Sequence, residues 1–189
     1  MAVYVTGFEQ LRANLKNELE GLKARTLEGM IQAAEEVKDD MDMKSPTIPI
    51  KYQNLERSWF IVSTRGVHTG NSFSFTGKEA DKEQAHHAKT IADAMSNVSA
   101  NPGSLDVEFG FGTKYAIWVH EMVEPKNWTR AGSGAKFLEI AIGRKKREML
   151  KTIQQVAYIK GYGLAGEGKG GHTGRIYMRD IRTERYVTR

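Results

Sequence analysis

The sequence predicts an α+β fold, in which a long N-terminal helix and a C-terminal helix pack on a small antiparallel β-sheet, with a helical insertion and an extended C-terminal arm. Apolar residues recur every three or four positions from Phe8 to Asp42 and again from Lys136 to Ala157, which is the spacing of amphipathic helices. Trp59 to Val62 is aromatic and β-branched, and Leu105 to Phe109 alternates apolar and charged residues. Both patterns are typical of strands.

The first helix is expected to be longer than a single small core needs. At about 1.5 Å per residue, 8–42 would form a helix of about 50 Å. Thr6 is expected to cap its first turn, with Glu9 as the capping-box partner, and Ser45-Pro46 should prevent its extension. We expect copies of the chain to cover part of so long a helix.

The chain is expected to form one core domain and an arm. Its 189 residues suit a single domain with appendages. We assign 1–160 to the core, with an insertion at 64–104 that contains a further helix at 78–97. Residues 161–189 form a glycine-rich tether and an arm, since 161–174 alone holds seven glycines. The strand-like end of the arm is expected to dock on a neighbouring subunit, through Ile176, Tyr177 and Met178.

Composition limits the classes of protein that the chain can belong to. Cysteine is absent, which excludes disulfides and thiolate zinc sites and favours an intracellular compartment. The N-terminus lacks the charged and apolar regions of a secretory signal, and no run approaches the roughly 20 apolar residues of a membrane span. We therefore expect no membrane partner.

The formal net charge of +5 is concentrated in the C-terminal third. The basic cluster on the last predicted helix is expected to face solvent and to contact passing DNA non-specifically, or an acidic partner. It consists of Arg144, Lys145, Lys146 and Arg147. An alternative function is therefore a non-specific nucleic-acid-binding protein that uses this basic region. The acidic pairs Glu35-Glu36 and Asp39-Asp40 on the first helix are interpreted as solvated side chains.

The three tryptophans are expected in two environments. Trp59 and Trp118 are assigned to strands, the second within 115–119, and are expected in the core. Trp128 lies in a polar loop beside Arg130. These two residues are candidates for contacts with a subunit or partner, because aromatic and arginine side chains are enriched at interfaces.

No pattern predicts an enzyme, a metal or a cofactor. Adjacent His86 and His87 would point about 100° apart on a helix, so they lack the spacing of paired metal ligands. His120-Glu121 is interpreted as the end of a strand at a subunit contact. Gly110 to Lys114 lacks the spacing of a phosphate-binding loop and is interpreted as a turn.

Four stretches, taken in order, resemble the neck or tail-completion proteins of tailed bacteriophages, which are also described as minor tail or head–tail joining proteins. The stretches are Val5 to Leu11 opening the first helix, Ser45-Pro46 followed by Asn54 to Trp59, Gly110 to Ala116 with Val119-His120-Glu121, and Lys136-Phe137-Leu138 with Ala141. They span about three quarters of the chain. The family commonly has Thr-Gly before the Leu-x-x-Ser motif, which is Leu55 to Ser58 here, and this chain departs from it with Gln53-Asn54.

The resemblance implies a structural virion protein without a catalytic site. Such a protein would form a homo-oligomeric ring at the head–tail junction, more often a hexamer than a dodecamer, and would surround the DNA channel. Its partners would be the adjacent head-connector and the tail-tube or terminator proteins. It would be assembled in the host cytoplasm and end in the virion.

Overall fold

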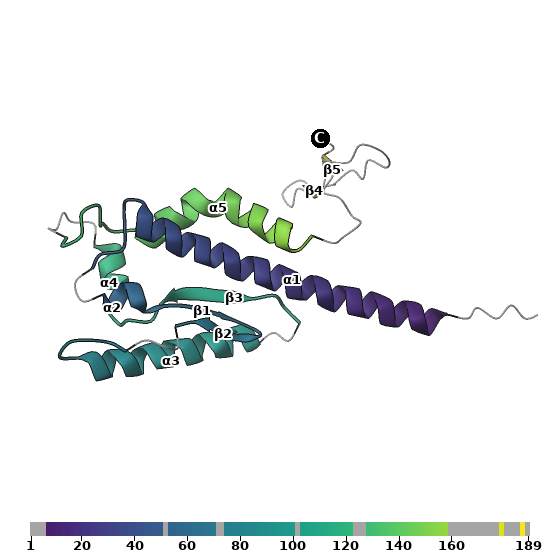
Figure 1. The fold of residues 1–189 in the computed structure, drawn as a ribbon, viewed down its shortest axis with the longest axis horizontal. Helices are drawn as coiled ribbons and strands as arrows, with labels where there is room; N and C mark the ends of the chain where they lie inside the picture. Colours follow the sequence, from purple (N-terminus) through teal and green to yellow (C-terminus); the bar gives the residue numbers. More distant parts are fainter. Residues whose placement is uncertain are drawn as a thin grey trace, which may run out of the picture. The chain divides into compact units, whose positions relative to one another are not determined.

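The computed structural model describes residues 7–50, 53–70, 74–100, 103–122, 128–158, 178–179 and 186–187. The chain divides into two units, Met1–Ala157 and Tyr158–Arg189. The elements of the first unit are α1 (Phe8–Met43), α2 (Asn54–Arg57), β1 (Trp59–Ser63), β2 (Gly66–Thr69), α3 (Ala80–Ser99), β3 (Val107–Phe111), α4 (Ala116–Glu121) and α5 (Phe137–Val156), as Figure 1 shows. In the second unit, β4 (Met178–Arg179) pairs antiparallel with β5 (Tyr186–Val187). The predicted α+β class is confirmed.

Helix α1 is as long as expected, with 36 residues. Gly7 rather than Thr6 holds the N-cap position, at a φ of 102° that glycine adopts without strain. The predicted capping box is therefore wrong, and Thr6 itself lies outside the described residues. The helix ends at Met43, just before Ser45-Pro46, because a residue that precedes proline disfavours helical geometry.

A three-stranded antiparallel sheet lies at the centre of this unit, in the order β2-β1-β3. Ile61 of β1 is opposite Phe109 of β3 and Thr69 of β2. Every residue of β1 is buried, as its apolar sequence predicts for a strand covered on both faces. Figure 1 shows the reason, since α1 and α3 lie on opposite faces of the sheet.

Side chains of β1 alternate between two hydrophobic clusters. Trp59 and Ile61 belong to the larger cluster, which β1 shares with the second half of α1 and the start of α5. Phe60 and Val62 belong to a smaller cluster under α3. The alternation follows from the period of two that places successive side chains of a strand on opposite faces.

Helix α3 contributes more to the core than its alanine-rich sequence suggests. It buries Ile91, Ala94 and Val98 against the sheet, together with His87. These positions repeat every three or four residues, so they share one side of the helix. The segment between β1 and β3 therefore covers one face of the sheet.

Residues 116–121 form a helix where the sequence predicted a strand. Tyr115, Ala116 and Val119 pack against the larger core cluster, a spacing that suits one turn of helix rather than alternation along a strand. His120 and Glu121 consequently lie at the end of a helix. Trp118, predicted in the core, is 73% exposed.

Helix α5 runs antiparallel to α1 and packs along its second half. Near the start of α5, Arg144 contacts Asp40, and further along, Thr152 donates a 2.6 Å hydrogen bond to Glu36. Gly29 then lies against Ile153, near the end of α5. Among the described residues, no helix is long and apolar enough to cross a membrane.

Candidate functional site

The basic cluster on α5 is partly engaged within the chain. Arg144 donates from Nε to Oδ2 of Asp40 at 2.7 Å and from Nη1 to the carbonyl oxygen of Ser45 at 2.9 Å. Lys145 is paired with Glu148 one turn away, and this hydrogen bond raises the pKa of Lys145. Lys146 and Arg147 are exposed. These last two are the members of the cluster best placed to meet phosphates or carboxylates of a partner.

Asp40, predicted to be solvated, is only 3% exposed. Burial would raise the pKa of its carboxyl, but hydrogen bonds and charge from Arg144 and Lys44 outweigh burial and lower that pKa. Glu35 and Asp39 are exposed as expected. Asp40 differs because its side of α1 faces α5, and a buried carboxylate requires a cationic partner.

The described part of the polar loop, from Trp128 on, contacts the core through Arg130. Arg130 donates to the carbonyl oxygen of Asp42 and forms a 3.7 Å ion pair with Glu56. Trp128 is half-buried. It helps to line an open cavity of about 900 Å³ whose wall also contains Leu55 and Tyr115. Burial, and secondarily the charge of Glu83, raise the pKa of Tyr115 to about 12.

Two residues of the predicted docking arm, Ile176 and Tyr177, lie outside the described residues. The third, Met178, is opposite Val187 in the β4-β5 pair. The role of this arm stays a prediction.

Helix α4 presents an apolar surface that sequence analysis missed. Ile117 is 66% exposed and Trp118 is 73% exposed, and the two are adjacent. We call this pair the α4 surface. The same five residues that suggested a strand also fit one helical turn, with Tyr115, Ala116 and Val119 inward and these two outward. Short apolar runs do not distinguish the two structures by periodicity.

A second apolar surface covers the first half of α1. Phe8, Leu11, Leu15 and Leu19 lie on one side of the helix, and each is more than half exposed. We call these four residues the free stripe. Figure 1 shows that this half of α1 extends past the other helices and strands of its unit. The sequence predicted the stripe as part of one long apolar side, but not that this half would be uncovered.

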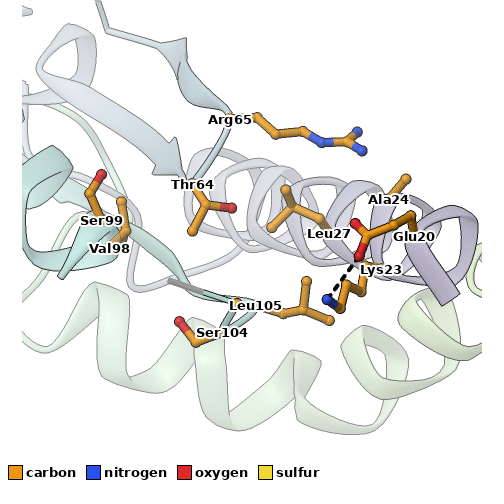
Figure 2. A pocket seen from close by; sticks show the side chains of 11 residues that line it. Glu20, Lys23, Ala24, Leu27, Thr64, Arg65, Val98, Ser99, Ser104 and Leu105 are labelled. Atoms are coloured by element: carbon orange, nitrogen blue, oxygen red, sulfur yellow. Dashed lines mark hydrogen bonds and ion pairs between the residues drawn. The ribbon is translucent and has the colours of Figure 1, made fainter. Parts of the chain in front are cut away.

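A polar cavity of about 320 Å³ lies where α1 leaves the core (Figure 2). Glu20 and Lys23, joined by a 3.1 Å ion pair, stand on one wall. Thr64, Val98 and Ser99 stand on the other. The charged residues of its lining are Glu20, Lys23 and the exposed Arg65, and the first two are paired with each other, so the cavity offers no set of converging charges that would select a particular ligand.

The histidines considered as metal ligands make hydrogen bonds with the backbone. Nδ1 of His86 lies 3.0 Å from the carbonyl oxygen of Gly112, and Nε2 of the buried His87 lies 2.8 Å from that of Gly70. His120 pairs with its neighbour Glu121 at 2.8 Å. Within the described part of the chain, no group of three or more histidine, aspartate or glutamate side chains is arranged to hold a metal ion.

Comparison with known proteins returns no relative. No family model matches the sequence, and neither the curated proteins nor the solved structures contain a match.

Proposed function

We propose that this chain is a structural virion protein that forms a homo-oligomeric ring at the head–tail junction of a tailed bacteriophage. The ring would join the head connector to the tail-tube or terminator protein and surround the DNA channel. Support comes from the order of the four stretches that resemble neck and tail-completion proteins, and from the long first helix that opens an α+β fold.

The observation that carries this proposal is the presence of two separate exposed apolar surfaces on one small unit. One is the free stripe of α1, and the other is the α4 surface formed by Ile117 and Trp118. Contiguous exposed apolar surface commonly marks a site of protein association. A chain with two such surfaces can make two kinds of contact, as closed assemblies larger than a dimer often do.

The charge of the chain suits a ring through which DNA passes. A net charge of +5 favours proximity to phosphates without any need for base recognition. Lys146 and Arg147 are the exposed members of the basic cluster on α5. The alternative of a separate nucleic-acid-binding protein has less support, because Arg144 and Lys145 are paired within the chain.

The test is to delete the gene from the phage genome that carries it and to image the particles. We expect DNA-filled heads and separate tails, with joining restored when the chain is supplied from a plasmid. Electron microscopy of complete particles should show six copies, or twelve, in a ring at the junction. Infectious particles without the protein, or a single copy per particle, would exclude the proposal.

A further inference from the structure

The free stripe ends where the body of the domain begins. Phe8 is 65% exposed, Leu11 53%, Leu15 61% and Leu19 52%, and Leu22 is partly buried. From Leu27 to Met41, α1 contributes to the core through Leu27, Ile31, Ala34, Val37 and Met41. We propose that the free stripe binds the free stripe of a second copy, with the two α1 helices antiparallel and related by a two-fold axis at Leu15. This inference does not depend on the proposed function.

The spacing of the stripe is self-complementary in the antiparallel direction. From Phe8 to Leu22 the intervals between apolar residues are three, four, four and three, a palindrome about Leu15. With Leu15 facing the partner's Leu15, Leu11 faces the partner's Leu19 and Phe8 faces the partner's Leu22. A two-fold contact requires that one surface fit its own copy, and this pattern meets that requirement along the whole exposed length.

The body of the domain excludes a parallel arrangement. Gly29 follows Leu22 by seven residues, so it lies on nearly the same side of the helix. That position is already occupied, because a Cβ on Gly29 would be 2.9 Å from the Cα atom of Ile153 in α5. A parallel partner would bring its own body against this α5. In the antiparallel arrangement, each body lies beyond the free N-terminal end of the other helix.

Charges beside the stripe make both attractive and repulsive contacts in this register, so the register rests on the apolar spacing. Reversal about Leu15 brings Glu9 close to the partner's Lys23, but it brings Arg12 at least as close to the partner's Lys16 as to the partner's Glu20. The two-fold axis repeats each pair. Lys16, at the outer edge of the stripe, also approaches the partner's Lys16.

The interface is small, so we expect a dissociation constant on the order of micromolar. Light scattering of the full-length chain after size exclusion should give the mass of a dimer at high concentration and of a monomer after dilution. Leu15→Glu should weaken pairing at least tenfold and leave the melting temperature unchanged, since Leu15 is outside the core. Asn17→Glu, two residues further and about 200° around the helix, is the matched control.

Cysteine cross-linking tests the orientation, because the chain has no cysteine of its own. Leu15→Cys should form a disulfide-linked dimer under mild oxidation, whereas Asn17→Cys should not. Phe8→Cys alone should stay monomeric, and Phe8→Cys combined with Leu22→Cys should cross-link. Efficient linking of Phe8→Cys alone would show a parallel pair and overturn the proposal. Equal linking at positions 15 and 17, or a monomer at all concentrations, would also overturn it.

These outcomes are separate from those of the proposed function. The cross-links are measured on the purified chain, and the ring is observed in particles. If the purified chain is monomeric but a ring is present in the virion, the pairing of free stripes is excluded and the proposed function is not.

Discussion

Arg144 of α5 binds the buried carboxylate of Asp40 in α1, across a separation of 104 residues in the sequence. The contact joins the C-terminal end of α1 to α5. Arg144 also donates to the carbonyl oxygens of Lys44 and Ser45, which follow α1. One side chain thus satisfies both a buried charge and backbone acceptors at a helix end.

Loss of this arginine is expected to destabilise the fold. Arg144→Ala would leave Asp40 buried with Lys44 as its remaining cationic contact, and removing one partner of a buried pair costs about 3–5 kcal/mol. Because Arg144 is partly exposed, we expect about 2–3 kcal/mol. Urea denaturation measures the change in the free energy of unfolding. Arg147→Ala, an exposed neighbour, should change it by less than about 0.5 kcal/mol.

The same pair predicts a dependence of stability on acid. The pKa of Asp40 is lower in the folded chain than its ordinary value of 3.8. Its contribution is therefore complete above about pH 4 and is lost as the pH falls through the folded pKa. Asp40→Asn should be less stable than wild type at pH 7, and the difference should shrink below pH 4. A constant difference from pH 7 to pH 3 in chemical denaturation would contradict this account.

Tyr115 predicts a second dependence at alkaline pH. Its pKa is raised from 10.0 to about 12, so the folded chain retains the phenol proton over a range in which the unfolded chain loses it. Stability from this group is complete below pH 10 and declines toward pH 12. Two pKa units correspond to about 2.7 kcal/mol at most. Tyr115→Phe should reduce the loss between pH 9 and pH 12, measured against wild type by denaturation.

Two helical glycines should respond in opposite directions to alanine. A Cβ on Gly29 would lie 2.9 Å from the Cα of Ile153 and 3.2 Å from its carbonyl oxygen. Gly29→Ala should therefore cost about 1–3 kcal/mol, as overpacking does. An added Cβ on Gly143 in α5 would have no atom within 4 Å apart from the nearby backbone of its own helix, so Gly143→Ala should gain up to about 1 kcal/mol from helix propensity. Thermal unfolding of both variants checks the contrast.

The α4 surface predicts a loss of assembly without a loss of folding. Trp118→Ser removes the more exposed of its two side chains, and the free energy of unfolding should change by less than about 0.5 kcal/mol. If the α4 surface forms a contact between copies, complementation with this variant should join at least tenfold fewer heads to tails. Lys114→Ser, an exposed residue just before α4, is the control. Normal joining of heads to tails with Trp118→Ser would show that assembly does not require a contact through the α4 surface.

Much of the fold was predictable because its elements carry strong periodic patterns. The spacing from Phe8 to Asp42 predicted α1 to within one residue of its end, and the aromatic and β-branched run at Trp59 predicted β1. The run at 115–119 was too short for periodicity to separate a strand from a helical turn. Tertiary packing favours the helix, since Tyr115 at the N-cap of α4 and Val119 four residues later both pack against the core.

The candidate surfaces were less predictable than the fold. Arg144 belongs to a run of four basic residues, and only its distance from Asp40 in space distinguishes it from Arg147. The free stripe has the same spacing as the buried half of α1. Which half is covered depends on where α5 ends, which is at Val156, close to Gly29. No local pattern in α1 indicates the length of α5.

The alternating side chains of β1 have a consequence for the folding and unfolding of this unit. Trp59 and Ile61 support one cluster, and Phe60 and Val62 support the other, so a single five-residue backbone is common to both. Shortening the chain by excising 64–104 would leave Phe60 and Val62 facing water. Because β1 belongs to both clusters, we expect them to unfold in one cooperative step, with neither remaining folded by itself.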